Sequence, residues 1–161
     1  MIEHQRVSTL LIVTSLAVSL VMTLLPLPTV LSIGRPAFYT MTVMFWAAMQ
    51  PHKFGVIAAW CCGILIDVIY GTPFSEHGLA MAIAAYIVIK ARELLWSFPL
   101  TQQALLMWPI FTVYAFVLFW IDGVAGIDVD PWWRWLPAFF SAVFWPLWAF
   151  LLERMAELEV G

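Results

Sequence analysis

Charged residues are scarce in this sequence: Lys, Arg, Asp and Glu make up 11% of its 161 residues, while hydrophobic residues make up 64%. A soluble domain carries about 25% charged residues, so the composition indicates an integral membrane protein. The mean hydropathy of +0.95 agrees with this class. Basic residues do not gather in a run, which excludes the usual surface for nucleic acid. We therefore expect membrane lipid, and no nucleic acid, among the partners.

Residues that carry chemistry are also few. The two cysteines, Cys61 and Cys62, are adjacent within an apolar run and predict buried thiols, not a disulfide or a redox pair. The histidines His4, His52 and His77 fall in separate connections, so we interpret them as interfacial polar residues and expect no metal site. The sequence contains no phosphate-binding glycine loop and no GxSxG or HExxH motif. These absences favour a protein that is not an enzyme and has no cofactor.

Six apolar runs predict an all-α membrane protein with six transmembrane helices in one integral membrane domain that spans residues 1–161. A bilayer about 30 Å thick requires about 20 residues per span, so six spans and their turns nearly use up the chain. The expected spans are 7–25, 36–50, 54–71, 76–95, 102–121 and 135–152. The longest polar connection is expected between Asp122 and Arg134, and a charged tail after residue 152. A cleaved signal peptide is the alternative for the first run, but its length favours an uncleaved span.

The charges between the spans predict the orientation of the chain. Cytoplasmic connections are enriched in Lys and Arg. With the N-terminus inside, five basic residues face the cytoplasm: Arg6, Lys53, Lys90, Arg92 and Arg154. Two face outward, Arg35 and Arg134. Both termini are therefore expected in the cytoplasm. The same topology places an aromatic belt at the outer interface, formed by Trp132, Trp133 and Trp135.

One run, residues 55–71, combines small residues with an acid. Gly55, Ala59 and Gly63 recur every fourth position, Asp67 takes the next such position, and Gly71 follows. On a helix these positions form one stripe, and small residues allow helices in a membrane to approach closely. An acid within a span is costly and usually faces protein or water. Two interpretations of Asp67 remain open: a structural carboxyl group that bonds neighbouring helices, and a directly functional one.

Three classes of function fit this pattern: an interaction subunit, a small-molecule or lipid-binding or transport subunit with Asp67 as ligand or proton site, and a membrane enzyme. A single carboxylate does not make an acid and base pair, which disfavours the enzyme. Transport would require paired charges or a broken helix at the midplane, and neither is evident. The sequence favours a non-catalytic interaction subunit.

An ordered set of short motifs from residue 34 onward resembles the rod shape-determining protein MreD family of Gram-negative bacteria. The matching features are, in chain order, Arg35-Pro36, Phe45-Trp46, Pro51-His52-Lys53, Gly55, Gly63, Asp67, Gly71, Gly78-Leu79-Ala80, Tyr86, Phe98-Pro99-Leu100, Gln102-Gln103-Ala104-Leu105 and Trp145-Pro146. The chain departs from the family at Ala37, where an acidic or amide residue is common, and at Phe74-Ser75, where a Leu-Gly pair is common.

The resemblance implies an inner-membrane component of the machinery that inserts peptidoglycan along the rod of a bacterial cell. Its implied partners are the bitopic scaffold MreC, the glycosyltransferase RodA with its class B penicillin-binding protein, and MreB filaments on the cytoplasmic side. The family's shape is similar to the substrate-binding subunits of energy-coupling-factor transporters, which keeps ligand binding as the alternative.

The partner-binding or helix-packing residues predicted for this chain are Gly55, Ala59, Gly63, Asp67, Gly71, Arg35 and Pro36. We expect the stripe and Asp67 to form a surface or outer pocket that receives a segment of MreC. The basic residues Lys53, Lys90 and Arg92 lie together on the cytoplasmic side in this topology. They are open to two interpretations, contact with filaments or the charge bias of cytoplasmic loops, and the second is favoured.

Overall fold

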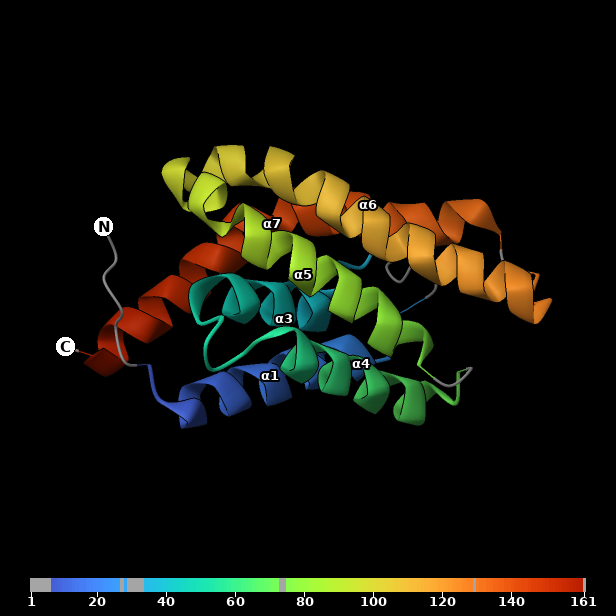
Figure 1. Ribbon diagram of the computed structural model, residues 1–161, viewed down its shortest axis with the longest axis horizontal. Helices are drawn as coiled ribbons and strands as arrows, with labels where there is room; N and C mark the ends of the chain where they lie inside the picture. Colours follow the sequence, from blue (N-terminus) through green and yellow to red (C-terminus); the bar gives the residue numbers. More distant parts are fainter. Residues whose placement is uncertain (1–6, 27, 29–33, 73–74, 129, 161) are drawn as a thin grey trace.

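The computed structural model is a bundle of helices (Figure 1). It describes every residue except 1–6, 27, 29–33, 73–74, 129 and 161, and the side chains of 131–133 and 160 are also outside the description. The described helices are α1 (Thr9–Leu24), α3 (Phe38–Met49), α4 (Val56–Tyr70), α5 (Glu76–Ser97), α6 (Leu100–Ala125) and α7 (Pro131–Val160). Each overlaps one of the six predicted spans, so the all-helical class is confirmed for this part of the chain.

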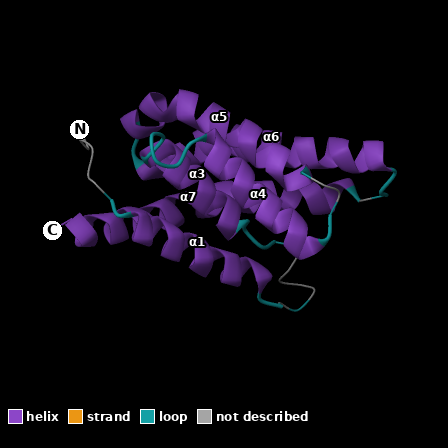
Figure 2. Cartoon of the chain, turned by 60° about the horizontal axis from the view of Figure 1, so that its bottom comes forward, coloured by secondary structure: helices purple, strands orange, loops and turns teal. Residues whose placement is uncertain are grey.

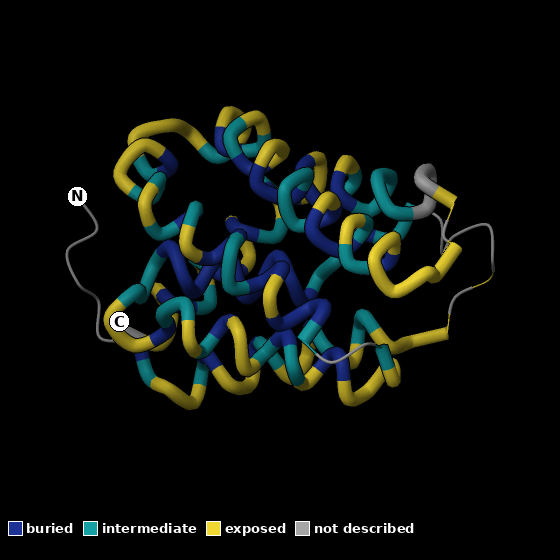
Figure 3. Tube along the Cα trace, turned by 45° about the vertical axis from the view of Figure 1, so that its right-hand side comes forward, coloured by how far each residue is buried: buried dark blue, intermediate teal, exposed yellow. Residues whose placement is uncertain are grey.

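Helix α3 lies at the centre of the bundle and contacts α1, α4, α5 and α7 (Figure 2). All ten residues from Tyr39 to Ala48 are buried, and Figure 3 shows the buried segments gathered inside the bundle. The helix carries no charged side chain, so burial on all sides leaves no ion without a partner. With 12 residues α3 is the shortest of the six described helices, and its burial means that neighbouring helices surround it on all sides.

The outer helix α1 is attached to α3 through small polar side chains. Ser15, Ser19 and Thr23 recur every fourth position and share one face of α1. The indole Nε1 of Trp46 donates to Ser15 Oγ at 2.8 Å, and the N–H of Tyr39 donates to Thr23 Oγ1 at 3.2 Å. The exposed side of α1 is mostly apolar and includes Leu10, Val13, Val18 and Val21.

The ends of α6 and α7 correct the prediction of a long polar connection between Asp122 and Arg134. Helix α6 continues to Ala125, where Gly126 ends it with φ of 72°, a backbone angle that glycine adopts readily. Helix α7 begins at Pro131, since proline is favoured at the first helical position. Asp122 and Arg134 are therefore helical residues. The predicted charged tail is also helical up to Val160.

The two cysteines differ in a way that corrects another expectation. Both thiols are free, but Cys61 is exposed on the surface of the bundle and Cys62 is half-buried. Adjacent residues point about 100° apart on a helix, so one thiol turns inward while the other remains on the outer side of α4. Of the predicted aromatic belt, Trp135 is half-buried, and the side chains of Trp132 and Trp133 lie outside the description.

Within the described residues, two helices are long and apolar enough to cross a membrane, α6 and the 134–159 part of α7. Helices α1, α3 and α4 are apolar but have 16, 12 and 15 residues. The start of α1 and the end of α7 lie at one end of the bundle; the end of α4, the start of α5, the end of α6 and the start of α7 lie at the other (Figure 1). We call this second end the α4–α5 end.

Candidate functional site

Asp67 lies at the α4–α5 end and holds the beginning of α5. Its Oδ1 accepts hydrogen bonds from Thr72 Oγ1 at 2.8 Å and from the His77 N–H at 2.9 Å, and His77 Nδ1 lies 2.8 Å from the same oxygen. Its Oδ2 accepts from the Gly78 N–H at 3.1 Å. The Asp67 residue is only 4% exposed. The carboxylate therefore satisfies two N–H groups that the first turn of a helix leaves without intrahelical partners.

This arrangement replaces an ordinary helix cap. Ser75 occupies the cap position of α5, but its φ is 70° and its side chain forms no capping hydrogen bond. Asp67, from the preceding helix, supplies the oxygen atoms instead. The cap thus joins the last turn of α4 to the first turn of α5.

Gly63 brings the same two helices into backbone contact. A Cβ atom at this position would lie 2.4 Å from the carbonyl oxygen of His77 and 2.5 Å from Gly78 Cα. These distances are far below van der Waals contact, so any larger side chain would move α5 away from α4. In this structure the Gly63 and Asp67 side of α4 is covered by α5 of the same chain.

The other predicted stripe residues have different positions. Ala59 is fully buried in the core, whereas Gly55 and Gly71 lie at the two ends of α4 as its N-cap and C-cap. Gly71 adopts φ of 65°, and its N–H donates to the Asp67 carbonyl oxygen. Gly71 therefore ends α4 through backbone geometry, and nothing lies within 4 Å of the position that its Cβ would take.

A second polar cluster, the Arg134 cluster, joins three helices through Arg134, Glu76 and Asp122. Arg134 Nε donates to Asp122 Oδ2 at 2.8 Å and Nη2 donates to Glu76 Oε1 at 3.1 Å; Nη2 also pairs with Asp122 Oδ2. The side chains of Glu76 and Asp122 are 1% and 4% exposed. Glu76 Oε2 is buried and has no hydrogen-bond partner in the described part of the protein. One guanidinium group therefore holds two buried carboxylates.

Sequence reasoning missed this cluster, because it assigned Asp122 and Arg134 to the outer side as loop charges. It also interpreted His77 as an interfacial residue in a connection. The assignment to a connection is wrong: His77 lies in the first turn of α5, within the predicted span 76–95, and is buried against Asp67. Only a weak indication of the Arg134 cluster was present in the sequence: acidic and basic residues lie near the ends of four predicted spans.

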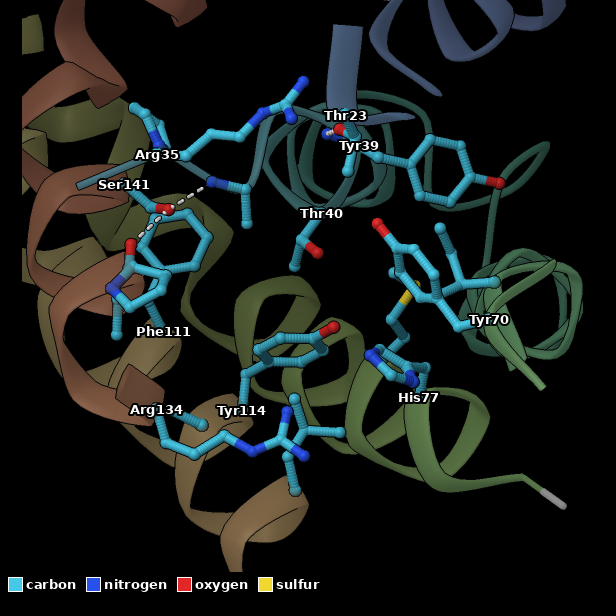
Figure 4. A pocket seen from close by; sticks show the side chains of 18 residues that line it. Thr23, Arg35, Tyr39, Thr40, Tyr70, His77, Phe111, Tyr114, Arg134 and Ser141 are labelled. Carbon is cyan, nitrogen blue, oxygen red and sulfur yellow. Dashed lines mark hydrogen bonds between the residues drawn. The ribbon is translucent and has the colours of Figure 1, made fainter. Parts of the chain in front are cut away.

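A cavity of about 310 Å³ opens among the helices at the α4–α5 end (Figure 4). Its polar lining includes Arg35, Tyr70, His77, Tyr114 and Arg134, and none of the described residues that line it is acidic. Of the predicted site residues, Arg35 and Pro36 line this cavity, but Asp67 and Gly63 do not. Among the described residues, no group of three His, Cys, Asp or Glu side chains could hold a metal ion.

Apolar helices, two of them long enough to cross a bilayer, together with ionic groups buried between them, are typical of a helical membrane protein. The family model for the rod shape-determining protein MreD matches residues 4–155, so the chain belongs to the MreD family. The rod shape-determining protein MreD of Haemophilus influenzae is 26% identical over 149 residues, which cover 92% of this chain and 91% of that protein. No solved structure shows a significant match.

Proposed function

We propose that this protein is a non-catalytic subunit of the rod elongation complex in the bacterial inner membrane, where it maintains cell shape by scaffolding peptidoglycan synthesis. The observation that carries the proposal is the family match over residues 4–155. Composition supports it, because a chain with 64% hydrophobic residues has little material outside the membrane. Its partners are then met mainly through helix faces and short connections.

All six helices are proposed to cross the membrane, with both termini in the cytoplasm. Lys53, Lys90, Arg92 and Arg154 belong to the end of the bundle that holds the termini, whereas Arg35 and Arg134 belong to the α4–α5 end. This distribution supports the α4–α5 end as the outer one. The similarity of the bundle to the substrate-binding subunits of energy-coupling-factor transporters stays a prediction.

Helix α4 is the proposed binding surface for MreC. Its 15 residues span about 22 Å at 1.5 Å per residue, less than the roughly 30 Å of the hydrocarbon region. A short helix is accommodated better when another helix covers it. The outer side of α4 is apolar and exposed, and we call it the α4 outer face: Ile57, Cys61, Leu65 and Val68.

The stripe residues have an indirect part in this proposal. Gly63 and Asp67 fix α4 against α5 and thereby set the position of the α4 outer face. Gly55 and Gly71 set the length of α4, while Arg35 and Pro36 lead into α3, which contacts α4. RodA, its penicillin-binding protein and MreB are proposed to contact other surfaces of the bundle.

Copurification with MreC tests this surface with a matched pair of variants. Val68 on α4 and Val124 on α6 are 73% and 77% exposed, and both lie at the α4–α5 end. Tryptophan is tolerated near a membrane interface but prevents a partner helix from packing closely. We expect Val68→Trp to reduce the recovery of MreC at least tenfold and Val124→Trp to leave it unchanged, at equal protein levels. Normal recovery with both variants would contradict MreC binding at α4.

Ligand binding is the second candidate function, and the cavity is the observation that favours it. The sequence-based version of this hypothesis, in which Asp67 is the ligand or proton site, has less support than a ligand site in the cavity. Both Asp67 oxygens accept hydrogen bonds within the chain, and the residue does not line the cavity.

A further inference from the structure

We infer that the cavity at the α4–α5 end binds the phosphate group of an anionic compound, and that Arg35 is the residue that pairs with it. Membership of the family assigns no ligand to this cavity. Phosphate binding stands apart from MreC binding, because it is tested on the purified chain alone.

The first step is the charge balance of the cavity. Two arginines line it, Arg35 and Arg134, and no acidic residue does so among those described. Arg134 is already paired, because its guanidinium donates to Asp122 and Glu76, neither of which lines the cavity. Arg35 donates to a neutral group, the carbonyl oxygen of Leu25, at 2.6 Å. The end of the cavity near Arg35 is therefore positive.

The second step is an incomplete set of hydrogen bonds. The Nε atom of Arg35 is buried and has no hydrogen-bond partner in the described part of the protein. A buried donor without a partner is costly, and more so when it carries charge. A planar guanidinium presents several donors in a fork that matches the oxygens of a phosphate. Because Nε itself is enclosed by the protein, an anion in the cavity would pair with the charge and the terminal nitrogens of Arg35.

The third step is the shape and lining of the cavity. Figure 4 shows Arg35 and Arg134 at opposite sides of the space, with the hydroxyl groups of Thr40, Tyr70 and Tyr114 turned toward it. These hydroxyls can bond the other oxygens of a phosphate or its polar substituents. The rest of the lining is apolar, with Ile66, Met81, Phe111, Ala115, Leu118 and Ala138 among its residues.

Size then selects the part of the ligand that enters. A volume of about 310 Å³ lies at the lower limit of small-molecule sites. It accommodates a phosphorylated headgroup but not the acyl chains of a lipid as well. Two sources share this chemistry: an anionic phospholipid whose chains remain in the bilayer, and a free phosphate compound.

Native mass spectrometry of the detergent-purified chain tests the inference, with phosphatidylglycerol, phosphatidylcholine and inorganic phosphate as probes in separate titrations. We expect phosphatidylglycerol to bind with at least tenfold preference over phosphatidylcholine. Arg35→Gln keeps a donor for the Leu25 carbonyl but removes the charge, so it should weaken this binding about tenfold. The matched control is Arg154→Gln, which removes the same charge from an exposed pair with Glu157. Arg154 lies 20 residues along α7 from Arg134, or about 30 Å.

Two further variants keep the result interpretable if Arg35→Gln folds poorly. Thr40→Val removes a hydroxyl of the lining, and Ala138→Leu fills part of the cavity. Both should weaken phosphatidylglycerol binding while Arg154→Gln does not. If inorganic phosphate binds and shows the same dependence on Arg35, the ligand is a soluble phosphate compound. Equal losses for Arg35→Gln and Arg154→Gln, or no binding of any probe, would overturn the inference.

Discussion

Two polar clusters are buried at the same end of the bundle, and they differ in how their partners are distributed along the chain. The Asp67 carboxylate accepts hydrogen bonds, among the described residues, from groups 5 to 11 positions further on, and both of its oxygens are satisfied. Arg134 joins residues 12 and 58 positions away, and one oxygen of Glu76 has no partner in the described part. The first cluster closes a local turn, whereas the second depends on the packing of three helices.

The comparison predicts the largest effect at the long-range cluster. Arg134→Gln would leave Asp122 and Glu76 buried without a cation, and removing one partner of a buried pair costs about 3–5 kcal/mol. We expect a marked fall in the unfolding temperature in detergent. Arg154→Gln is the reference, because its pair with Glu157 is exposed and such pairs contribute at most about 1 kcal/mol. Equal unfolding temperatures for the two variants would show that the Arg134 cluster contributes little to stability.

The contact between α4 and α5 should give the next largest effect. Gly63→Ala places a Cβ 2.4 Å from the His77 carbonyl, and overpacking of this kind costs about 1–3 kcal/mol. Gly123→Ala is the matched control, since it is also a helical glycine but has nothing within 4 Å of its Cβ position. There alanine should be neutral or stabilising by up to about 1 kcal/mol. Thermal unfolding of both variants checks the difference.

The smallest expected effect distinguishes the charge of Asp67 from its hydrogen bonding. Asn at position 67 keeps one acceptor oxygen but turns an amide NH₂ group toward a donor of α5, so Asp67→Asn should cost about 1–2 kcal/mol. Asp67→Ala loses every acceptor and should cost more. Hydrogen exchange at the amides of His77 and Gly78 would report the opening of this cap directly. Unchanged exchange in Asp67→Ala would contradict the capping role.

The two clusters also show what the sequence could and could not predict. The order and approximate bounds of the helices followed from apolar runs, and the four-residue spacing singled out Gly63 and Asp67 as residues of one helix face. The partners of Asp67 were missed because His77 was assigned to a connection instead of to the first turn of α5. The end of α6 and the beginning of α7 were missed because they depend on Gly126 and Pro131. As a result, Asp122 and Arg134 fell outside the predicted helices.

The Arg134 cluster and the cavity could not be predicted from periodicity at all. Glu76 and Arg134 are 58 residues apart, and only the packing of α5, α6 and α7 brings them together. Arg35 was identified through a family resemblance, but its position beside a cavity depends on the same packing. Local patterns therefore identified the helix contacts near one turn, and long-range contacts defined the rest of the site.

A photo-crosslinking residue placed at Val68 and, separately, at Val124 in living cells shows which helix contacts MreC, because it requires no purification and disturbs no buried contact. These two positions have similar exposure on different helices. We expect a crosslink to MreC from position 68 and none from position 124. A strong crosslink from position 124, with none from position 68, would contradict the assignment of the α4 outer face to the partner.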